Sequence, residues 1–516
     1  MAEVSLDGRK ALRTKIATLL TLTLCGCATS ALRMAPPAPD HPWSPTVDAT
    51  GALTAAPASS AAAPSQGYVL PPNPAGATLP ATTVDSQRVY QLADLIDLAE
   101  STNPETRIAW NEARNAALTA GIARSAYLPR ISATALGARQ QQNGRNSGLG
   151  ASVAQNNSFS GGVAVLSLEW LLFDFGQRHA LVNAADEGAV IANIAFTGAH
   201  QRLIHAVSVA FYAYSAASAR TDTAAVSLKD AQDIQIAAES RKKHGIGTVI
   251  EVAQARQLTA QAELAKVDAE GDKSNAYFAL LSAIGVSPLT HIQIADVSKR
   301  PLPSNLDQPI DHVLADALER RPDVLAAIAQ QKAADAGVRA AQADFLPKFF
   351  VSASGTHANG NVDLSAVPAV GDQAPTVNLS NHHWGATVIV GVTIPLYNGG
   401  VRNAALAQAR NRADSAAEAL DRVKLDAAQE VAMADSKLHT SLAAVSATRV
   451  LLDASQVTYD AALAAFRRGV GSSTDMLVAE RQLLEARNAA VDAHSAALSA
   501  AATLALVCGS LGQAPN

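Results

Sequence analysis

Few residues in this sequence could do chemistry, and their spacing fits no catalytic motif. Residues Gly469–Thr474 are rich in glycine, as a phosphate-binding loop would be, but the lysine of such a loop is missing. No GxGxxG motif follows a predicted strand, and neither CxxC nor HExxH occurs. His382 and His383 precede a predicted strand, which favours a loop pair over a metal site. We therefore expect no enzyme activity, no metal and no cofactor.

Cys27 is the cysteine whose surroundings suggest a reaction. Four basic residues between positions 9 and 15 precede the apolar run Ile16–Leu24, in the order typical of a secretory signal. This run is too short to span a bilayer. It ends in Leu24-Cys25-Gly26-Cys27, which resembles a bacterial lipobox, whose last cysteine receives acyl chains such as palmitate and becomes the new N-terminus. The alternative is an ordinary signal peptide with chance cysteines. We predict lipidation of Cys27, and by the same resemblance Ala28 favours the outer membrane.

Two further short motifs place an acid beside a glycine turn. Gly245-Ile246-Gly247 is followed by Glu251, and Gly469-Val470-Gly471 is followed by Asp475. Glycine permits positive φ and ends a helix sharply, and an acid in the first turn of the next helix is favoured by the helix dipole. Each motif predicts a sharp helix–turn–helix connection.

The segments that contain these motifs occur twice along the chain, in the same order. Residues 95–105 match 313–323, and residues 126–130 match 344–348, both at an offset of 218. Two later matches share an offset of 224, pairing residues 172–178 with 396–402 and residues 245–252 with 469–476. Such self-similarity indicates a duplicated structural unit. We assign the first repeat to residues 88–300, the second to 301–511 and a tail to 512–516.

The segment before the repeats differs in composition. Eleven of the 23 prolines lie between Pro36 and Pro80, among many alanines. Such a stretch cannot bury a core. We therefore expect a signal peptide at residues 1–26 and an extended Pro/Ala-rich linker at 27–87.

Each repeat is predicted to run helix, strand, loop, strand, long helix, turn and helix. Residues 162–172 and 385–396 alternate apolar and small or polar side chains, with weaker partner strands at 131–139 and 349–357. The polar stretches 140–161 and 358–383 are read as loops. Segments of about ten residues with one apolar face suit a transmembrane barrel, although a half-buried soluble sheet gives the same alternation.

The helices are exceptionally long. Residues 401–468 contain neither glycine nor proline, and residues 178–244 contain no proline. At about 1.5 Å per residue, the first of these would span roughly 100 Å. The shorter helices predicted at 472–508 and 323–346 nearly equal it when placed end to end, and 248–284 and 105–128 do the same in the first repeat. For each repeat we therefore predict two parallel helical rods of similar length: one is a single continuous helix, and the other, the spliced rod, consists of two shorter helices placed end to end.

Composition excludes two other classes of protein. With 40 basic and 45 acidic residues the formal net charge is −5, which lacks the basic excess of a nucleic-acid binder. The chain is 48% hydrophobic, largely through alanine, yet past the N-terminus no 18 uninterrupted apolar residues occur, which argues against a helical membrane protein. Four strands cannot close a barrel alone, so membrane strands would require several chains.

At this point the order of motifs resembles the TolC-type outer membrane efflux protein family, over roughly residues 88–511. The resemblance rests on the doubled plan and on four segments: Asn103-Pro104-Glu105, Tyr127-Leu128-Pro129, Trp170–Gly176 and Gly469-Val470-Gly471 with Asp475. It implies a mainly α fold with transmembrane β structure. Three chains would share a 12-stranded barrel, four strands from each, above a periplasmic tunnel of coiled-coil helices. The lipobox is similar to the lipoprotein branch of the family.

The resemblance also implies functional positions and partners. A periplasmic adaptor protein, itself coupled to an inner-membrane pump, would dock at the tips Gly245-Ile246-Gly247 and Gly469-Val470-Gly471. Asp475, with Glu251 as its counterpart, would form an acidic gate in the pore, although Val478 stands where some members have a second acid. Both acids could equally be ordinary helix N-terminal acids.

The expected function is passive conduction of toxic small organic compounds out of the cell, through an outer membrane homotrimer. By resemblance to fusaric-acid-type resistance pumps, aromatic acids are one candidate substrate. Two alternatives stay open: the channel of a type I protein-secretion system, and a structural coiled-coil lipoprotein without a pore.

Overall fold

A computed structural model describes most of the chain, which divides into two units, Met1–Thr83 and Val84–Asn516. The described residues of the first unit are 35–36, 38–40, 42–43, 45–54 and 68–79. Those of the second are 84–148, 151–296, 300–302, 309–359, 364–366, 377–379 and 384–512. Cys25, Cys27, His382 and His383 lie outside the described residues.

The first unit contains a small hairpin in the segment expected to be extended. Strands β1 (Thr46–Val47) and β2 (Leu53–Thr54) pair antiparallel around a turn in which the Asp48 carboxylate accepts hydrogen bonds from the Thr50 hydroxyl and from the Thr50 and Ala52 amides, at 2.7–2.9 Å. These hydrogen bonds lower the pKa of Asp48, and the bond from the Thr50 hydroxyl has the largest effect. Asn73, which caps the short 3₁₀ helix η2 (Pro74–Gly76), donates to the Gly51 carbonyl. Local turn chemistry thus orders part of a proline-rich segment.

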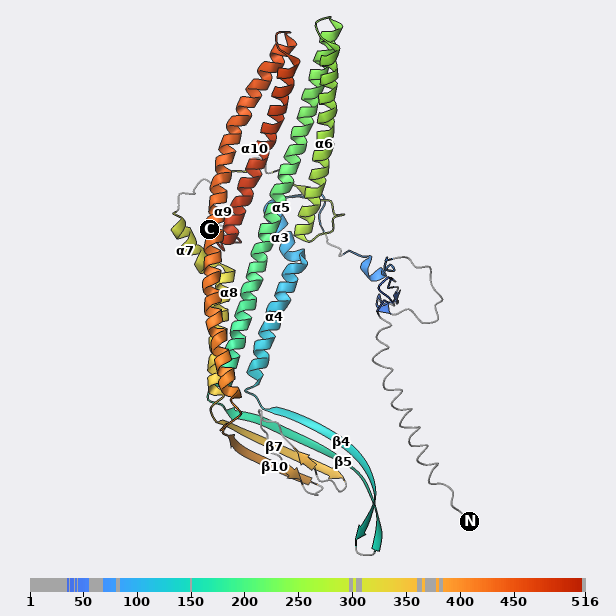
Figure 1. Cartoon of the computed structure of the whole chain (residues 1–516), viewed down its shortest axis with the longest axis vertical. Coiled ribbons are helices and arrows are strands. Elements are labelled where there is room, and N and C mark those ends of the chain that lie inside the picture. Colours follow the sequence, from blue (N-terminus) through green and yellow to red (C-terminus); the bar gives the residue numbers. More distant parts are fainter. Residues whose placement is uncertain are drawn as a thin grey trace, which may run out of the picture. The chain divides into compact units, whose positions relative to one another are not determined.

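The second unit is dominated by eight helices among its described residues (Figure 1). The first repeat supplies α3 (Leu92–Thr102), α4 (Pro104–Ser125), α5 (Gln177–Lys243) and α6 (Val249–Ile284). The second supplies α7 (Ile310–Arg320), α8 (Pro322–Ala343), α9 (Val401–Arg467) and α10 (Ser473–Val507). Both long helices have 67 residues. The predicted helix bounds are confirmed to within three residues.

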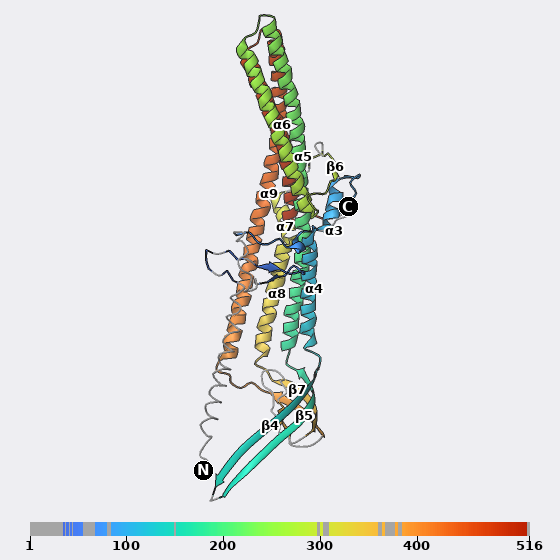
Figure 2. The same ribbon diagram turned by 90° about the vertical axis from the view of Figure 1, so that its right-hand side faces the viewer.

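The spliced rods are joined end to end by the X-Pro motifs. Figure 2 shows α6 and α4 following one another along α5. At their junction, Asn103 Nδ2 donates to the Ala283 carbonyl at 3.0 Å, and the Thr102 hydroxyl donates to the Ile284 carbonyl at 3.1 Å. In the second repeat Arg321 Nη1 donates to the Val507 carbonyl at 3.1 Å. Carbonyls at a helix C-terminus have no partner in their own helix, so the start of the next piece satisfies them.

Two larger core clusters and a smaller one, around Val324 and Leu420, lie at separate heights along the rods. One cluster gathers large side chains of α3, α5, α6 and α10 around the parallel pair β3 (Val89–Tyr90) and β6 (Gln293–Ile294), with Phe211, Leu280 and Ile284 at its centre. The second lies near the helix tips and includes Ile234, Phe466, Met476 and Leu483. Elsewhere the buried residues are mostly alanine, which lets helices approach closely.

α10 is the one described helix that is long and apolar enough to cross a membrane on length and composition alone. Its apolar window has a mean hydropathy of 1.4, and the helix Ser473–Val507 contains eleven alanines. Within the chain it packs along α9 and α5. This resemblance to a spanning helix is weak evidence, because core helices rich in alanine meet the same criterion.

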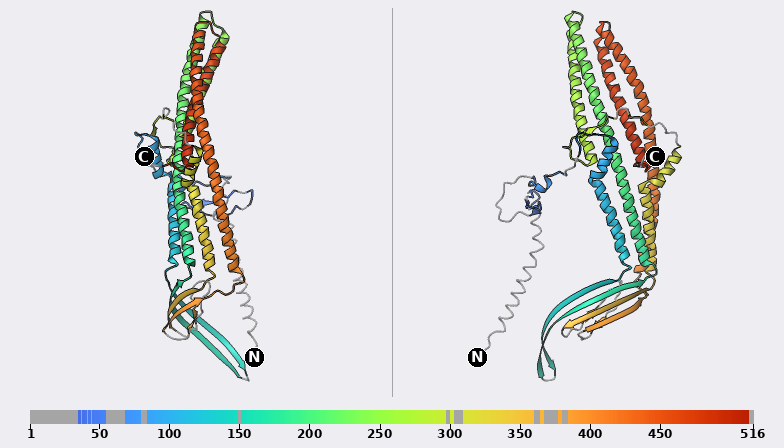
Figure 3. Two further views of the ribbon diagram at one scale, coloured as in Figure 1. Left: turned by 90° about the vertical axis from the view of Figure 1, so that its left-hand side faces the viewer. Right: turned by 180° about the vertical axis from the view of Figure 1, so that it is seen from behind.

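A four-stranded antiparallel sheet lies at the end of the rods opposite the turns, as Figure 3 shows. It contains β4 (Arg130–Gly148), β5 (Ala151–Phe173), β7 (Lys348–Asn359) and β10 (Trp384–Thr393), in the order β10-β7-β5-β4. Each repeat supplies one hairpin, and the two hairpins pair through β5 and β7. β4 and β10 therefore form the edges.

The alternation predicted for the last strand is confirmed. Along β10 every second residue is exposed, and the exposed side carries Ala386, Val388, Val390 and Val392. The strand ends at Thr393, before the predicted limit of 396, since the nearby Pro395 has no N–H for a ladder bond.

The predicted loops were partly wrong. Residues 140–161 are mostly strand, because β4 and β5 stay paired as far as Gly148 and Ala151. In the segment 358–383 the short strands β8 (Leu364–Ala366) and β9 (Val377–Leu379) pair with each other. Asn, Gln, Ser and Gly suggested irregular structure, but ladder hydrogen bonds use backbone groups and are indifferent to side-chain polarity.

Candidate functional site

The two predicted glycine turns lie at the far ends of the long helices and share one geometry. Gly245 and Gly469 both adopt φ of +81°. The Gly247 amide donates to the Arg241 carbonyl, and the Gly471 amide donates to the Ala465 carbonyl, each at 3.1 Å. The residue between the glycines faces solvent in both turns, with Ile246 65% and Val470 83% exposed. Each tip therefore presents one apolar side chain on a tightly closed turn.

The two acids stand in the first turns of the return helices but differ in their contacts. Glu251 forms a capping box, in which the Glu251 amide donates to the Thr248 hydroxyl and the Thr248 amide donates to the Glu251 carboxylate. The Glu251 carboxylate also lies 3.8 Å from Arg241 Nε. The Asp475 amide donates to the hydroxyl of Ser472, the N-cap of α10, and the Asp475 side chain is exposed. The structure thus engages the Glu251 side chain within the chain and leaves the Asp475 side chain exposed.

Arg241 joins the two tips. Its Nη1 donates to the Phe466 carbonyl at 2.6 Å, and its guanidinium carbon lies 4.7 Å from the centre of the Phe466 ring. Beside it the Ser473 hydroxyl donates to Gln254 Oε1 at 3.2 Å. Arg241 therefore does more than complement the dipole of α5, because it satisfies a carbonyl at the end of α9.

A buried polar cluster below the tips was not predicted from the sequence. Glu480 on α10 is only 3% exposed and accepts a 2.5 Å hydrogen bond from the Ser227 hydroxyl on α5. Next to it Arg487 donates to Asp230 at 3.4 Å and to Gln456 on α9 at 3.1 Å. Burial is the main cause that raises the pKa of Glu480 and of Asp230. The cluster joins the α5–α6 hairpin to the α9–α10 hairpin.

One sequence signal could have revealed this cluster. Glu480 shares a helix face with Met476 and Leu483, both buried, so it is a charge placed on an apolar stripe. Its partners could not be read from α10 alone, because Ser227 precedes it by 253 residues.

The motif around Phe173–Arg178 fastens the strands to the rods. Arg178 donates to the Ala126, Leu171 and Leu172 carbonyls and pairs with Asp174 at 3.0 Å. In the second repeat Arg402 pairs with Asp344 at 3.2 Å. The repeated motifs thus hold the sheet at the base of the helices. No group of three His, Cys, Asp or Glu side chains that could hold a metal ion occurs among the described residues.

Comparison with known protein families identifies a family with this duplicated plan. The model of the family described as outer membrane efflux protein matches residues 95–286 and again 313–510, once for each repeat.

Individual relatives agree with this match. Protein CyaE of Bordetella pertussis is 28% identical over 452 residues, covering 88% of this chain and 89% of that protein. The toluene efflux pump outer membrane protein TtgC of Pseudomonas putida is 26% identical and covers 72% of each chain. The crystal structure of the Campylobacter jejuni CmeC outer membrane channel superposes with a TM-score of 0.68 at 18% identity, over 82% of this chain and 87% of that one. Because the family model spans both repeats and most of the chain, this protein belongs to the outer membrane efflux protein family.

Proposed function

We propose that this protein is the outer membrane channel of a tripartite efflux system, and that it passively conducts toxic small organic compounds out of the cell. The observation that carries the proposal is the direct continuation of a sheet with an exposed apolar face into two 67-residue helices. At about 1.5 Å per residue these helices extend roughly 100 Å from the sheet. Such a molecule can cross an outer membrane and reach far into the periplasm.

The proposed pore is a homotrimer. The sheet has four strands and two unpaired edges, β4 and β10, whereas single-chain outer membrane barrels have at least eight strands. Pairing of β10 in one copy with β4 of the next would remove every edge once the ring closes. Three copies would give twelve strands.

Energy and selectivity would come from partner proteins. We assign adaptor docking to the tips Gly245-Ile246-Gly247 and Gly469-Val470-Gly471, where Ile246 and Val470 supply exposed apolar contacts. The adaptor would connect the tips to an inner-membrane pump.

Asp475 is the proposed gate residue. Three exposed copies around a pore would attract cations and repel one another. Glu251, its counterpart, is held by Arg241 and would support the tip.

The N-terminal segment carries the proposed membrane anchor. We assign residues 1–26 to a signal peptide, Cys27 to a lipid anchor and 27–87 to a linker. Loss of acyl labelling in Cys27→Ser would test the anchor.

Single-channel recording tests the function. The purified protein in planar bilayers is expected to conduct, and Asp475→Ala is expected to raise resting conductance, with Asp414→Ala on the exposed side of α9 as control. A protein that never conducts would be a structural coiled-coil lipoprotein. Equal resting conductance in Asp475→Ala and Asp414→Ala would mean that the protein is a channel that Asp475 does not gate.

A further inference from the structure

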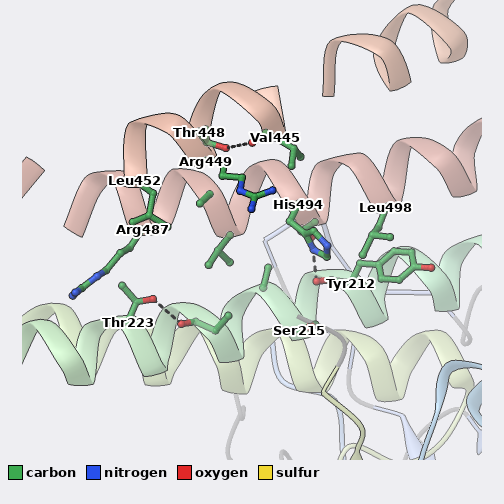
Figure 4. Close-up of a pocket in the computed structure, with 15 residues that line it drawn as sticks. Tyr212, Ser215, Thr223, Val445, Thr448, Arg449, Leu452, Arg487, His494 and Leu498 are labelled. Atoms are coloured by element: carbon green, nitrogen blue, oxygen red, sulfur yellow. Dashed lines mark hydrogen bonds between the residues drawn. The ribbon is translucent and has the colours of Figure 1, made fainter. Parts of the chain in front are cut away.

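A cavity of about 400 Å³ lies between the two hairpins, walled by α5, α9 and α10 (Figure 4). It opens because small side chains face one another there: Ser215, Ala216 and Ala219 on α5 oppose Ala490 and Val491 on α10. Larger side chains at its ends, Tyr212 and Leu498 at one and Leu452 and Arg487 at the other, hold the helices apart. Its volume lies within the range of small-molecule sites.

The charges of the wall have one sign. Of its 15 lining residues, the basic ones are Arg449, Arg487 and His494, and none is acidic. This is notable in a chain whose formal net charge is −5. Arg487 is occupied by Asp230 and Gln456, and His494 Nε2 lies 3.1 Å from the Arg300 carbonyl. Arg449 forms no ion pair with any acid in the described part of the chain, and Figure 4 shows it beside His494 above the cavity.

The remainder of the wall is apolar with a few hydroxyl groups. Ala216, Ala219, Leu452, Val491 and Leu498 form its apolar surface, and Ser215, Thr223 and Thr448 carry hydroxyls. A ligand that fits both halves has an apolar body and one anionic group. We propose that this cavity binds a small amphiphilic organic anion, with its carboxylate or sulfonate at Arg449 and its apolar body between α5 and α10.

The position of the cavity selects a soluble anion over a membrane lipid. Tyr212 is 35 residues from Gln177, the start of α5 beside the sheet, which places it about 50 Å from the strands. The hydrocarbon core of a bilayer is only about 30 Å thick. Thr223 lies 20 residues before Lys243, so the cavity is also about 30 Å from the tips. The site is thus distinct from the proposed docking tips, and it stands independently of channel activity.

Occupancy would also affect the scaffold. Both hairpins contribute to the wall, so a bound anion contacts each of them and stabilises their spacing by mass action.

The test is a fluorescence titration of the purified full-length protein in detergent, with 8-anilinonaphthalene-1-sulfonate as the probe. We expect a saturable site whose affinity falls at least tenfold in Arg449→Glu and which is lost in Ala219→Leu, where the added carbons fill the cavity. Arg412→Glu is the matched control, because Arg412 lines a separate alanine-rich groove between α8 and α9. Unchanged affinity in Arg449→Glu, or an equal loss in Arg412→Glu, would overturn the proposal.

Two further measurements keep the outcome clear. Thermal unfolding of each variant separates loss of the site from loss of the fold, and Arg449→Glu decides alone if Ala219→Leu does not fold, because Arg449 is exposed. Uncharged N-phenyl-1-naphthylamine should bind Arg449→Glu and the unmutated protein equally. Displacement of the probe by short-chain phosphatidylglycerol, but not by an aromatic carboxylate, would contradict a soluble anion.

Discussion

Glu480 places a carboxyl group where α5 and α10 meet, with the Ser227 hydroxyl as its hydrogen-bond donor. Burial, reinforced by the Asp230 carboxylate, raises its pKa against the opposing effect of Ser227 and Arg487. A raised pKa in the folded state means that folding favours the protonated form. The stabilising contribution of Glu480 is then present at low pH and lost as the pH rises through its folded-state pKa.

Glu480→Gln should therefore flatten part of the pH dependence of stability. We expect the melting temperature of the unmutated protein, relative to that of Glu480→Gln, to fall as the pH rises from 4.5, the ordinary value for glutamate. The measurement is thermal unfolding of both proteins over a pH series. Glu485→Gln, whose side chain is 69% exposed on the same helix, should follow the unmutated protein. A constant difference at all pH values would contradict the assignment.

Arg241 offers a second test at this scale, because its contacts depend on the planar guanidinium. Arg241→Lys keeps the charge but loses the forked donors and the stacking on Phe466. We expect faster amide exchange at residues 245–248 and 469–472, measured by hydrogen–deuterium exchange. Arg468→Lys, which alters an exposed basic residue next to the second tip, should leave exchange unchanged. Similar protection in both variants would mean that Arg241 does not join the tips.

At the scale of elements, the joint between α6 and α4 depends on Gly285. Its φ is +86°, and a Cβ there would lie 2.8 Å from Asn103 Cα. Gly285→Ala should lower the free energy of unfolding by at least about 1–2 kcal/mol, the cost of a left-handed alanine before any clash. Gly271→Ala in the same helix meets nothing within 4 Å and should stabilise by up to about 1 kcal/mol. Equal effects in denaturant unfolding would show that the joint is not tightly packed.

The helices were more predictable than the strands, for local reasons. Absence of glycine and proline over 401–468 and the Arg321-Pro322 start are signals within a few residues of the helix they define. The limits of β4 and β5 depend instead on pairing between Gly148 and Ala151 and on backbone bonds that polar side chains do not reveal. The Glu480–Ser227 contact needs the packing of α5 against α10, which no single segment encodes. The glycine turns at the tips were predicted from the sequence, whereas the contact between Arg241 and Phe466 that joins them was not.

For the whole molecule, the open sheet edges predict an assembly. Native mass spectrometry of the detergent-solubilised protein should give three chains per particle. Val388 is 72% exposed on β10, so Val388→Lys should place a charge in lipid and cost about 2–4 kcal/mol at the bilayer midplane. Thr387→Lys on the opposite face should be tolerated, as judged by the yield of trimer. A monomer, or equal loss in both variants, would contradict a trimeric barrel.

The joints in the spliced rods have a consequence for how the chain can change length. Deleting one residue inside α9 would rotate everything beyond it by about 100° and shorten the rod by about 1.5 Å, so every contact with α8 and α10 would lose register. The rod built from α8 and α10 is interrupted between Arg321 and Val507, where Arg321 Nη1 donates to the Val507 carbonyl but no peptide bond links the two pieces. A lost or gained residue beside this joint would alter the contact between the two ends but leave the helical register of each piece intact. A change of length should therefore disturb a local contact at a joint, whereas inside a continuous helix it disturbs every contact beyond it.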